Sequence, residues 1–227
     1  GSGPKRCPEA ATRSSFSAEM MRASPAALMV GVGLKISEPL GHMVIDIGGG
    51  TTEVAVLSLG EIVTHSSLDI AGDELDDSVI SYIRDMYGME IGHRTSEEVK
   101  IAIGSAYPLE EEVSCEICGK DIAAGLPRRL EISSAEIREA MSGPIRRIID
   151  ATKTCLDNTP PELARDLLST GITLVGGGAL IPGLAELISE ETGLQARVAD
   201  DPLTAVARGT ATLLEKLDEY EEVLAGD

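Results

Sequence analysis

The residues best suited to chemistry stand in one short stretch: Asp46, a glycine triplet at 48–50, then Thr51 and Thr52. Apolar runs flank the stretch on both sides, which predicts a strand, a tight turn and a second strand. Glycines have no Cβ, so their N–H groups can converge on a phosphate, and the threonine hydroxyls can donate to the same oxygens. Asp46 would offer a carboxylate to a phosphate-bound Mg²⁺ or its water. An ordinary glycine-rich hairpin is the alternative, but it explains the full combination less well.

A second glycine triplet, at 176–178, directly follows a β-branched strand expected at 172–175. Pro182 suits a first helical turn and Gly193 a C-terminal cap, so a helix is expected between about Pro182 and Thr192. Glycines in such a turn allow a ring or sugar to lie flat against the backbone, and the helix N-terminus adds positive potential. A turn that only packs a helix onto a strand is the alternative. Two triplets that each end a hydrophobic strand favour a pair of ligand loops.

The composition limits the partners that the chain can have. It holds 19 basic and 38 acidic residues among 227, and this net charge of −19 argues against a general nucleic-acid or anionic-membrane surface. With one phenylalanine and no tryptophan, the core must be aliphatic and base-stacking platforms are not expected. No apolar stretch approaches the length of a membrane span. Four cysteines fit a reducing cytoplasm, and Cys115-x-x-Cys118 lacks the second ligand pair of a zinc site, so both are assigned to a strand.

Other segments must support the first glycine loop. A short buried helix is expected at 26–34, a third antiparallel strand at 62–68, and a helix from Gly72 that ends at Gly88. The last helix, 203–214, carries an unusually small face, which would let two helices approach closely.

Thr95 followed three residues later by Glu98 matches a capping box, which predicts a helix through about Ala106. Glu97 and Lys100 are polar residues of that helix that could face a ligand. On periodicity alone, a solvated charged face is the favoured interpretation.

The middle of the chain is predicted to mix strands with a long helix. Ser133 and Glu136 form a second capping box, which starts a helical tract to about Asn158. Pro144 should kink or split that tract at Gly143. Strands are expected at 112–117, 120–123 and 128–132, and another short helix begins at Pro160-Pro161.

Several motifs together, in order and spacing, resemble the MreB family of bacterial actins over roughly residues 25–217. The segments that carry the resemblance are 45–56 (IDIGGGTTEVAV), 72–76 (GDELD), 103–108 (IGSAYP), 125–128 (GLPR), 174–180 (LVGGGAL) and 201–204 (DPLT). The resemblance implies an α/β, actin-like (ribonuclease H-like) ATPase lobe with an inserted smaller α+β subdomain. Residues 25–71 and 159–217 would form the core and 72–158 the insertion, between a poorly matched segment 1–24 and an acidic tail 218–227.

The resemblance also implies ligands and roles. The chain would bind ATP and Mg²⁺, with Asp46 as the catalytic and metal residue, and would act in the cytoplasm as a cytoskeletal protein of cell shape, in filaments with itself or with full-length MreB. A non-hydrolysing regulator or capping partner of such filaments is the alternative. The implied nucleotide contacts are Gly48, Gly49, Gly50 and Thr51 of the second phosphate loop, Glu97, Glu98, Val99 and Lys100 of the adenosine-side helix, and Gly176, Gly177, Gly178 and Ala179 of the adenosine loop.

The chain departs from the family pattern in two places. The family's first phosphate hairpin, Asp-Leu-Gly-Thr, lies in a lobe that also carries the membrane-binding surface, and these 227 residues resemble only the C-terminal half. The resemblance therefore predicts no direct membrane binding by this chain. Ala23-Ser24-Pro25 stands where the family has Glu-Glu-Pro, whose glutamate helps position the attacking water. Weak ATP binding with little hydrolysis is the expectation.

Overall fold

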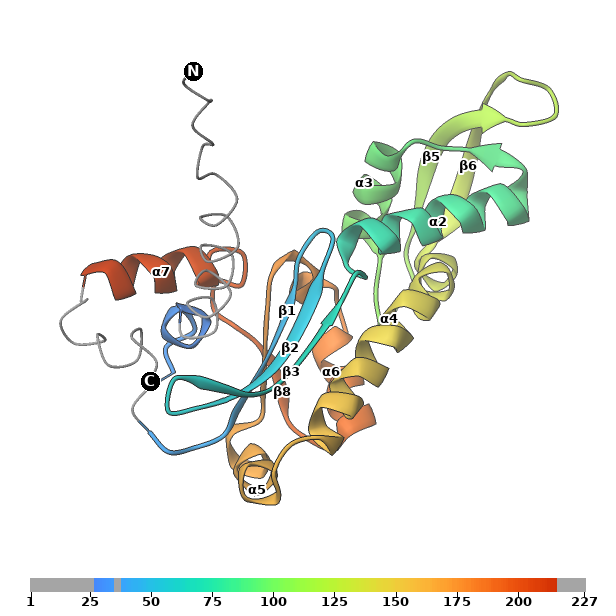
Figure 1. Ribbon diagram of the computed structural model, residues 1–227. Helices are drawn as coiled ribbons and strands as arrows, with labels where there is room; N and C mark the ends of the chain where they lie inside the picture. The colour runs from blue at the N-terminus through green and yellow to red at the C-terminus, as the bar shows by residue number, and fades with distance from the viewer. Residues whose placement is uncertain (1–26, 35–37, 216–227) are drawn as a thin grey trace, which may run out of the picture.

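The computed structural model of the chain describes residues 27–34 and 38–215 (Figure 1). The expectations for residues 1–24 and 218–227, including the match at Ala23-Ser24-Pro25, lie outside these ranges. No helix in the described part of the chain is long and apolar enough to cross a membrane. The larger of two sheets has the strand order β3-β2-β1-β7-β8. Its strands are β1 (His42–Ile47), β2 (Thr52–Ser58), β3 (Glu61–Leu68), β7 (Ile172–Val175) and β8 (Ala196–Val198).

Strand β1 lies at the centre of the larger sheet and sets the direction of its neighbours. It pairs antiparallel with β2, placing Asp46 opposite Glu53, and parallel with β7, placing Asp46 beside Val175. The expected antiparallel trio β1, β2 and β3 is confirmed. Because β1 and β7 are parallel neighbours, the two glycine triplets that follow them leave the sheet at the same edge.

Each face of this sheet is covered, which confirms an α/β architecture (Figure 1). On one face Ile45, Val54 and Leu174 join the apolar cluster of α4 (Ser134–Asp157), α5 (Pro161–Thr170) and α6 (Leu184–Thr192). On the other face Val44 and Leu57 pack with helical residues 27–31 and with α7 (Ala205–Glu215). The alternation of side chains along β1 divides its residues between these two layers.

The close helix crossing that the small residues of the last helix predicted is confirmed. A Cβ on Gly209 would lie 1.6 Å from the Ala27 carbonyl oxygen, and one on Gly31 would lie 1.8 Å from the Ala205 carbonyl oxygen. Both distances are far below van der Waals contact, so only glycine fits at these two positions.

The smaller sheet, β4-β5-β6, packs with two helices. Its elements are α2 (Gly72–Tyr87), β4 (Met89–Glu90), α3 (His93–Ile103), β5 (Ser114–Asp121) and β6 (Pro127–Ser133). Strand β5 is continuous across Gly119, where a break was predicted. Gly119 does not form a turn. It lets β5 approach β4 closely, since a Cβ there would lie 2.6 Å from the Glu90 carbonyl oxygen.

The predicted capping box at Thr95 is wrong. Helix α3 begins three residues earlier, with Gly92 in place of Thr95 as its N-cap and no side-chain cap. The Ser96 N–H already donates to the Gly92 carbonyl at 3.1 Å, so Thr95 lies inside the first turn. The helix also ends at Ile103, short of the expected Ala106, because Gly104 leaves the helix in an extended conformation.

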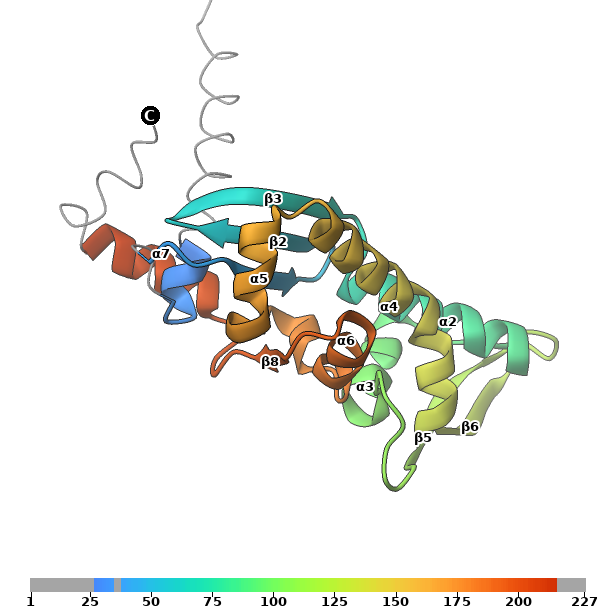
Figure 2. The same cartoon turned by 90° about the horizontal axis from the view of Figure 1, so that it is seen from below.

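Helix α4 has the predicted cap but is not split. The Glu136 N–H donates to Ser133 Oγ at 3.4 Å, and the Ser133 N–H donates to Glu136 Oε2 at 2.9 Å. The helix is continuous through Pro144, because buried Met141 and Ile145 hold it on both sides of the proline. Seen from below, its direction changes along its length (Figure 2), as a proline inside a helix would cause.

These two caps give a matched pair of stability predictions. Ser133→Ala is expected to lower the free energy of unfolding by about 1 kcal/mol, because it leaves an orphan N–H at the start of α4. Thr95→Ala, at the cap that does not form, should change it by less than about 0.5 kcal/mol. Urea denaturation of both variants checks this, and equal losses would contradict the assignment of the caps.

Candidate functional site

The two glycine loops lie at the carboxyl edge of the larger sheet, where the second loop packs against the end of β1. A Cβ on Gly176 would lie 2.3 Å from the Ile47 carbonyl oxygen and 2.6 Å from Asp46 Oδ1, and one on Gly178 would lie 2.2 Å from Ile47 Cγ2. Gly176 also has φ of +81°, a backbone conformation that favours glycine. Gly178 and Ala179 are buried, and residues 177–180 form a short 3₁₀ helix rather than an open turn. The second triplet therefore packs directly against the end of β1, next to the point where the first triplet begins.

The first loop presents backbone and one hydroxyl to solvent. Gly49, Gly50 and Thr51 are exposed, and the turn is closed by the Gly48 N–H, which donates to the Thr51 carbonyl at 2.9 Å. Thr52 was expected to donate to a ligand as well, and this is wrong. Its buried hydroxyl donates to the Ile70 carbonyl at 2.6 Å, so it holds the segment before α2 and is not available.

The start of α2 is fastened to this loop. The Gly72 N–H donates to the Gly48 carbonyl at 3.1 Å, and the Asp73 N–H donates to the Gly49 carbonyl at 2.8 Å. A Cβ on Gly50 would lie 3.8 Å from Asp73 Oδ2, so the Asp73 carboxylate stands beside the loop. Motif reasoning missed this acid because Gly-Asp at a helix start was taken only as first-turn charge.

The Asp46 carboxylate has an environment that suits the binding of a cation. Burial raises the pKa of the Asp46 carboxyl, and the negative charge of Glu53 raises it further. Glu53 is partnered by His65 at 3.3 Å, whereas no group of the described residues bonds to the Asp46 carboxylate. A half-buried carboxylate that has no bonding partner among the described residues, beside an exposed glycine loop, fits a Mg²⁺ ion or its water.

A metal ion at Asp46 would need donor atoms from a bound nucleotide as well as from the protein. The described residues contain no group of three or more His, Cys, Asp or Glu side chains that could hold an ion. Mg²⁺ commonly takes one or two protein carboxylates and completes its shell with water and phosphate oxygens. The donor set around Asp46 therefore fits Mg²⁺ bound together with a nucleotide.

The four predicted residues of α3 separate into different environments. Val99 is buried in the core, and Glu98 pairs with Arg94 at 2.9 Å on the exposed face. Glu97 is exposed. Lys100 Nζ lies near the loop, because it donates to the Gly72 carbonyl at 3.1 Å. The structure thus places Lys100 by the first glycine loop and turns Val99 away from it.

The segment after α3 contacts the segment after the second triplet. The Ala106 N–H donates to the Pro182 carbonyl at 2.7 Å. A Cβ on Gly183 would lie 2.4 Å from Tyr107 Cβ, and its φ is +77°. Together with the contact between Gly176 and Asp46, this connects the two glycine loops and the end of α3 around one edge.

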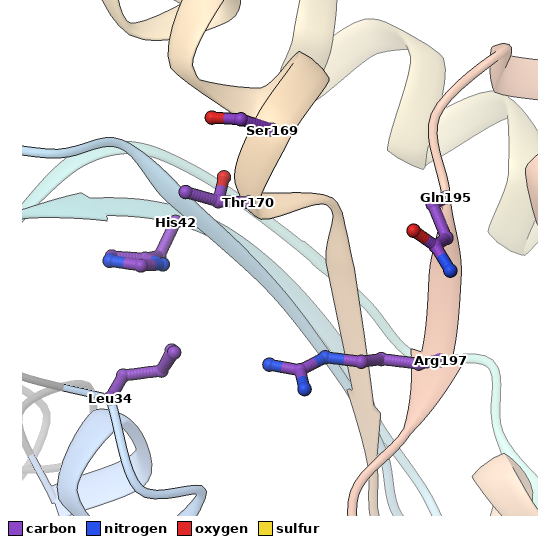
Figure 3. Close-up of a pocket in the computed structure, with 6 residues that line it drawn as sticks. All are labelled: Leu34, His42, Ser169, Thr170, Gln195 and Arg197. Atoms are coloured by element: carbon purple, nitrogen blue, oxygen red, sulfur yellow. The ribbon is translucent and has the colours of Figure 1, made fainter.

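Two surface cavities lie away from this edge. The first, about 370 Å³, sits at the amino ends of β1, β7 and β8 (Figure 3). It is lined by Leu34, His42, Ser169, Thr170, Gln195 and Arg197. The second, about 540 Å³, lies between α2 and α4 and is lined by acids and hydroxyls, among them Glu74, Asp77 and Tyr82. Neither of these two cavities includes a glycine loop, and the exposure of Gly49, Gly50 and Thr51 leaves the first loop at an open edge.

Comparison with known proteins places this geometry in context. A family model described as MreB/Mbl protein matches residues 9–222. The cell shape-determining protein MreB of Escherichia coli K12 is 48% identical over 196 residues, which cover 86% of this chain and 56% of that protein. The cell shape-determining protein Mbl of Bacillus subtilis is 40% identical over 215 residues, covering 95% of this chain and 65% of its own length. The chain thus spans little more than half the length of the MreB relative.

Solved structures agree with these matches. MreB5 of Spiroplasma citri bound to AMPPNP superposes with a TM-score of 0.84 at 40% identity, covering 88% of this chain and 60% of that one. The same protein bound to ADP gives a TM-score of 0.85 at 38% identity, covering 96% and 68%. A MamK double helical filament, at 21% identity and a TM-score of 0.72 over 95% of this chain and 71% of that one, shares the fold.

Proposed function

The chain belongs to the MreB/Mbl family, and from that premise we propose that it acts as a nucleotide-dependent element of the bacterial actin cytoskeleton that determines cell shape. Its actin-like fold is the one expected from the sequence. The observation that carries the proposal is the convergence of two glycine loops on Asp46, whose carboxylate has no bonding partner within residues 27–34 and 38–215. We place this activity in the cytoplasm.

The ligand that suits this edge is ATP with Mg²⁺. In the loop 48–51, Gly48 would close the turn, and Gly49, Gly50 and Thr51 would hold the phosphates through backbone N–H groups and the Thr51 hydroxyl. Asp46 would hold the ion or its water. Residues 176–179 would lie against the adenosine, with Glu97 and Lys100 approaching from α3. Bound Mg²⁺ would neutralise phosphate charge. The MreB5 structures with AMPPNP and ADP support this choice of ligand.

The open edge sets an expectation for affinity. Gly49, Gly50 and Thr51 are exposed, so phosphates held there stay in contact with water. A charge pair worth about 4 kcal/mol near a protein surface is worth only about 1 kcal/mol in bulk water. The 227-residue chain alone should therefore bind Mg-ATP more weakly than micromolar and hydrolyse it little.

Self-association into filaments, or joining those of full-length MreB, is the proposed cellular activity. A net charge of −19 makes copies of the chain repel one another. Salt shortens the range of that repulsion to about 8 Å near physiological ionic strength, so assembly should strengthen with salt or divalent cation.

The domain division also remains a proposal. Residues 25–71 and 159–217 would form the core and residues 72–158 the inserted subdomain. One buried apolar cluster runs through both parts, from Ile45 of β1 to Ile132 of β6, so the two would unfold together.

Calorimetry, phosphate release and sedimentation of the 227-residue chain test the proposed function. We expect weak Mg-ATP binding, slow phosphate release, and pelleting that grows with salt and Mg²⁺. Pelleting only with full-length MreB would favour the regulator or capping role over self-assembly. No nucleotide binding, and light scattering that stays flat in every titration, would contradict the proposal. Tight binding with turnover that Asp46→Ala abolishes would show a complete catalytic site and contradict the open edge.

A further inference from the structure

We infer that Asp76 is a positioning residue of the nucleotide site, which fixes Lys100 and with it the placement of α3 beside the glycine loops. This inference rests on the proposed function. Asp76 ends the segment 72–76 that contributed to the family resemblance, but the sequence analysis gave it no role of its own.

The contact between the two side chains is direct and shielded. Lys100 Nζ lies 2.9 Å from Asp76 Oδ2, and the two side chains are 12% and 9% exposed. The same ammonium donates to the Gly72 carbonyl at 3.1 Å. Two of its three donors are thereby committed within the protein. Lys100 thus ties α3 to α2 and has a single donor left for a ligand.

The environment of Asp76 disfavours an ionised carboxylate. Asp76 is 7% exposed, and its Oδ1 has no hydrogen-bond partner among the described residues. Burial raises the pKa of the Asp76 carboxyl, although Lys100 opposes the shift. A buried carboxylate with an unpartnered oxygen costs stability. Retention of such a group suggests a role other than folding.

The pattern of hydrogen bonds shows what the pair controls. The start of α2 is fastened to the first glycine loop by backbone bonds from Gly72 and Asp73, and these do not involve the Asp76 side chain. Two shielded side chains of α3 bond to α2: Lys100, and the Ser96 hydroxyl, which donates to the Asp76 backbone carbonyl at 2.8 Å. A third contact, between His93 and Asp77 at 3.6 Å, is exposed. Loss of the Asp76 carboxylate should therefore release α3 while the phosphate loop keeps its supports.

This separation predicts a selective binding defect. Asp76→Asn should weaken Mg-ADP binding about fivefold, because the adenosine part approaches α3. Mg-pyrophosphate, which can use only the phosphate loop, should bind as it does to the unchanged chain. Calorimetry with both probes gives the ratio of the Mg-ADP affinity to the Mg-pyrophosphate affinity. Hydrogen exchange should be faster in α3 of the variant and unchanged in β1 and β2.

Two matched controls separate positioning from loss of stability. Asp77→Asn removes a neighbouring charge that is exposed and lies 3.6 Å from His93, and it should leave both affinities unchanged. Ser96→Ala removes a buried hydroxyl link between the helices, so it should lower stability but keep the ratio of the two affinities. Neither control touches Lys100.

A second variant guards against misfolding caused by an unpaired Lys100. In Asp76→Asn with Lys100→Gln, no charge is left buried, and the shorter glutamine cannot reach both former partners. This double variant should show the same selective loss of Mg-ADP binding. Equal losses for ADP and pyrophosphate, or wild-type binding of both, would overturn the inference. Absence of ADP binding by the unchanged chain would instead refute the proposed function.

Discussion

Replacing Gly176 with alanine is expected to lower the free energy of unfolding by about 3 kcal/mol or more. The Gly176 backbone has φ of +81° and ψ of 173°, a region that is essentially open to glycine alone. The added Cβ would also lie 2.3 Å from the Ile47 carbonyl oxygen and 2.6 Å from Asp46 Oδ1. Strain and overlap both act where the second glycine loop packs against Asp46 and Ile47 at the end of β1, so the defect should reach the candidate site directly.

Gly193→Ala is the matched control for this substitution. Gly193 also has a positive φ, +71°, but it lies in the left-handed helical region and has no atom within 4 Å of an added Cβ. It should cost only about 1 kcal/mol. Urea denaturation followed by circular dichroism measures both variants. Equal losses would show that the second loop does not pack against the end of β1 as described.

Asp46→Asn should have two opposite effects. It should weaken Mg-nucleotide binding tenfold or more, because a charged contact is worth about 1.5–3 kcal/mol. It should also make the ligand-free chain more stable at neutral pH, because burial and Glu53 disfavour the ionised Asp46 carboxyl. Functional sites commonly contain residues that favour ligand binding at a cost in folding stability.

The pH dependence of this stability gain follows from the direction of the pKa shift. The folded chain holds a proton on Asp46 more readily than the unfolded chain, since the folded pKa is raised. The contribution of Asp46 to stability is therefore fully present below its unfolded pKa and is lost as pH rises through the folded pKa. The advantage of the asparagine variant should appear above the folded pKa and vanish in acid.

Thermal unfolding across this pH range, with Asp150→Asn as an exposed control on α4, checks the result. The control should match the unchanged chain throughout. An Asp46→Asn variant that loses stability at neutral pH, or that binds Mg-nucleotide normally, would contradict the role given to Asp46.

Local patterns in the sequence were enough to predict the glycine loops and most elements. Glycine triplets after β-branched runs, and Ser133 with Glu136, act within a few residues, so their consequences appear in the sequence itself. The pairing of Asp46 beside Val175 is different, because it joins strands separated by four helices. The resemblance to a family, rather than periodicity, made that placement predictable.

The errors share a physical cause, which is competition between possible partners for one polar group. Thr52 could bond a ligand or the Ile70 carbonyl, and the buried backbone prevailed. Thr95 matched a cap, but Gly92 already satisfied the N–H of Ser96. Asp76 left one signal that could have been used. It stands three residues before Val79, on the buried face of α2, where an acid requires a partner.

Amide chemical shifts during a titration with Mg-ADP show whether an adenine nucleotide binds at the edge where the two glycine loops lie. We expect the largest shifts at residues 48–51 and 176–179, with smaller ones at the start of α2 and along α3. Residues around His42 and Arg197, which line the cavity at the opposite ends of the strands, should not respond (Figure 3). Shifts confined to that cavity, with silent glycine loops, would contradict the claim.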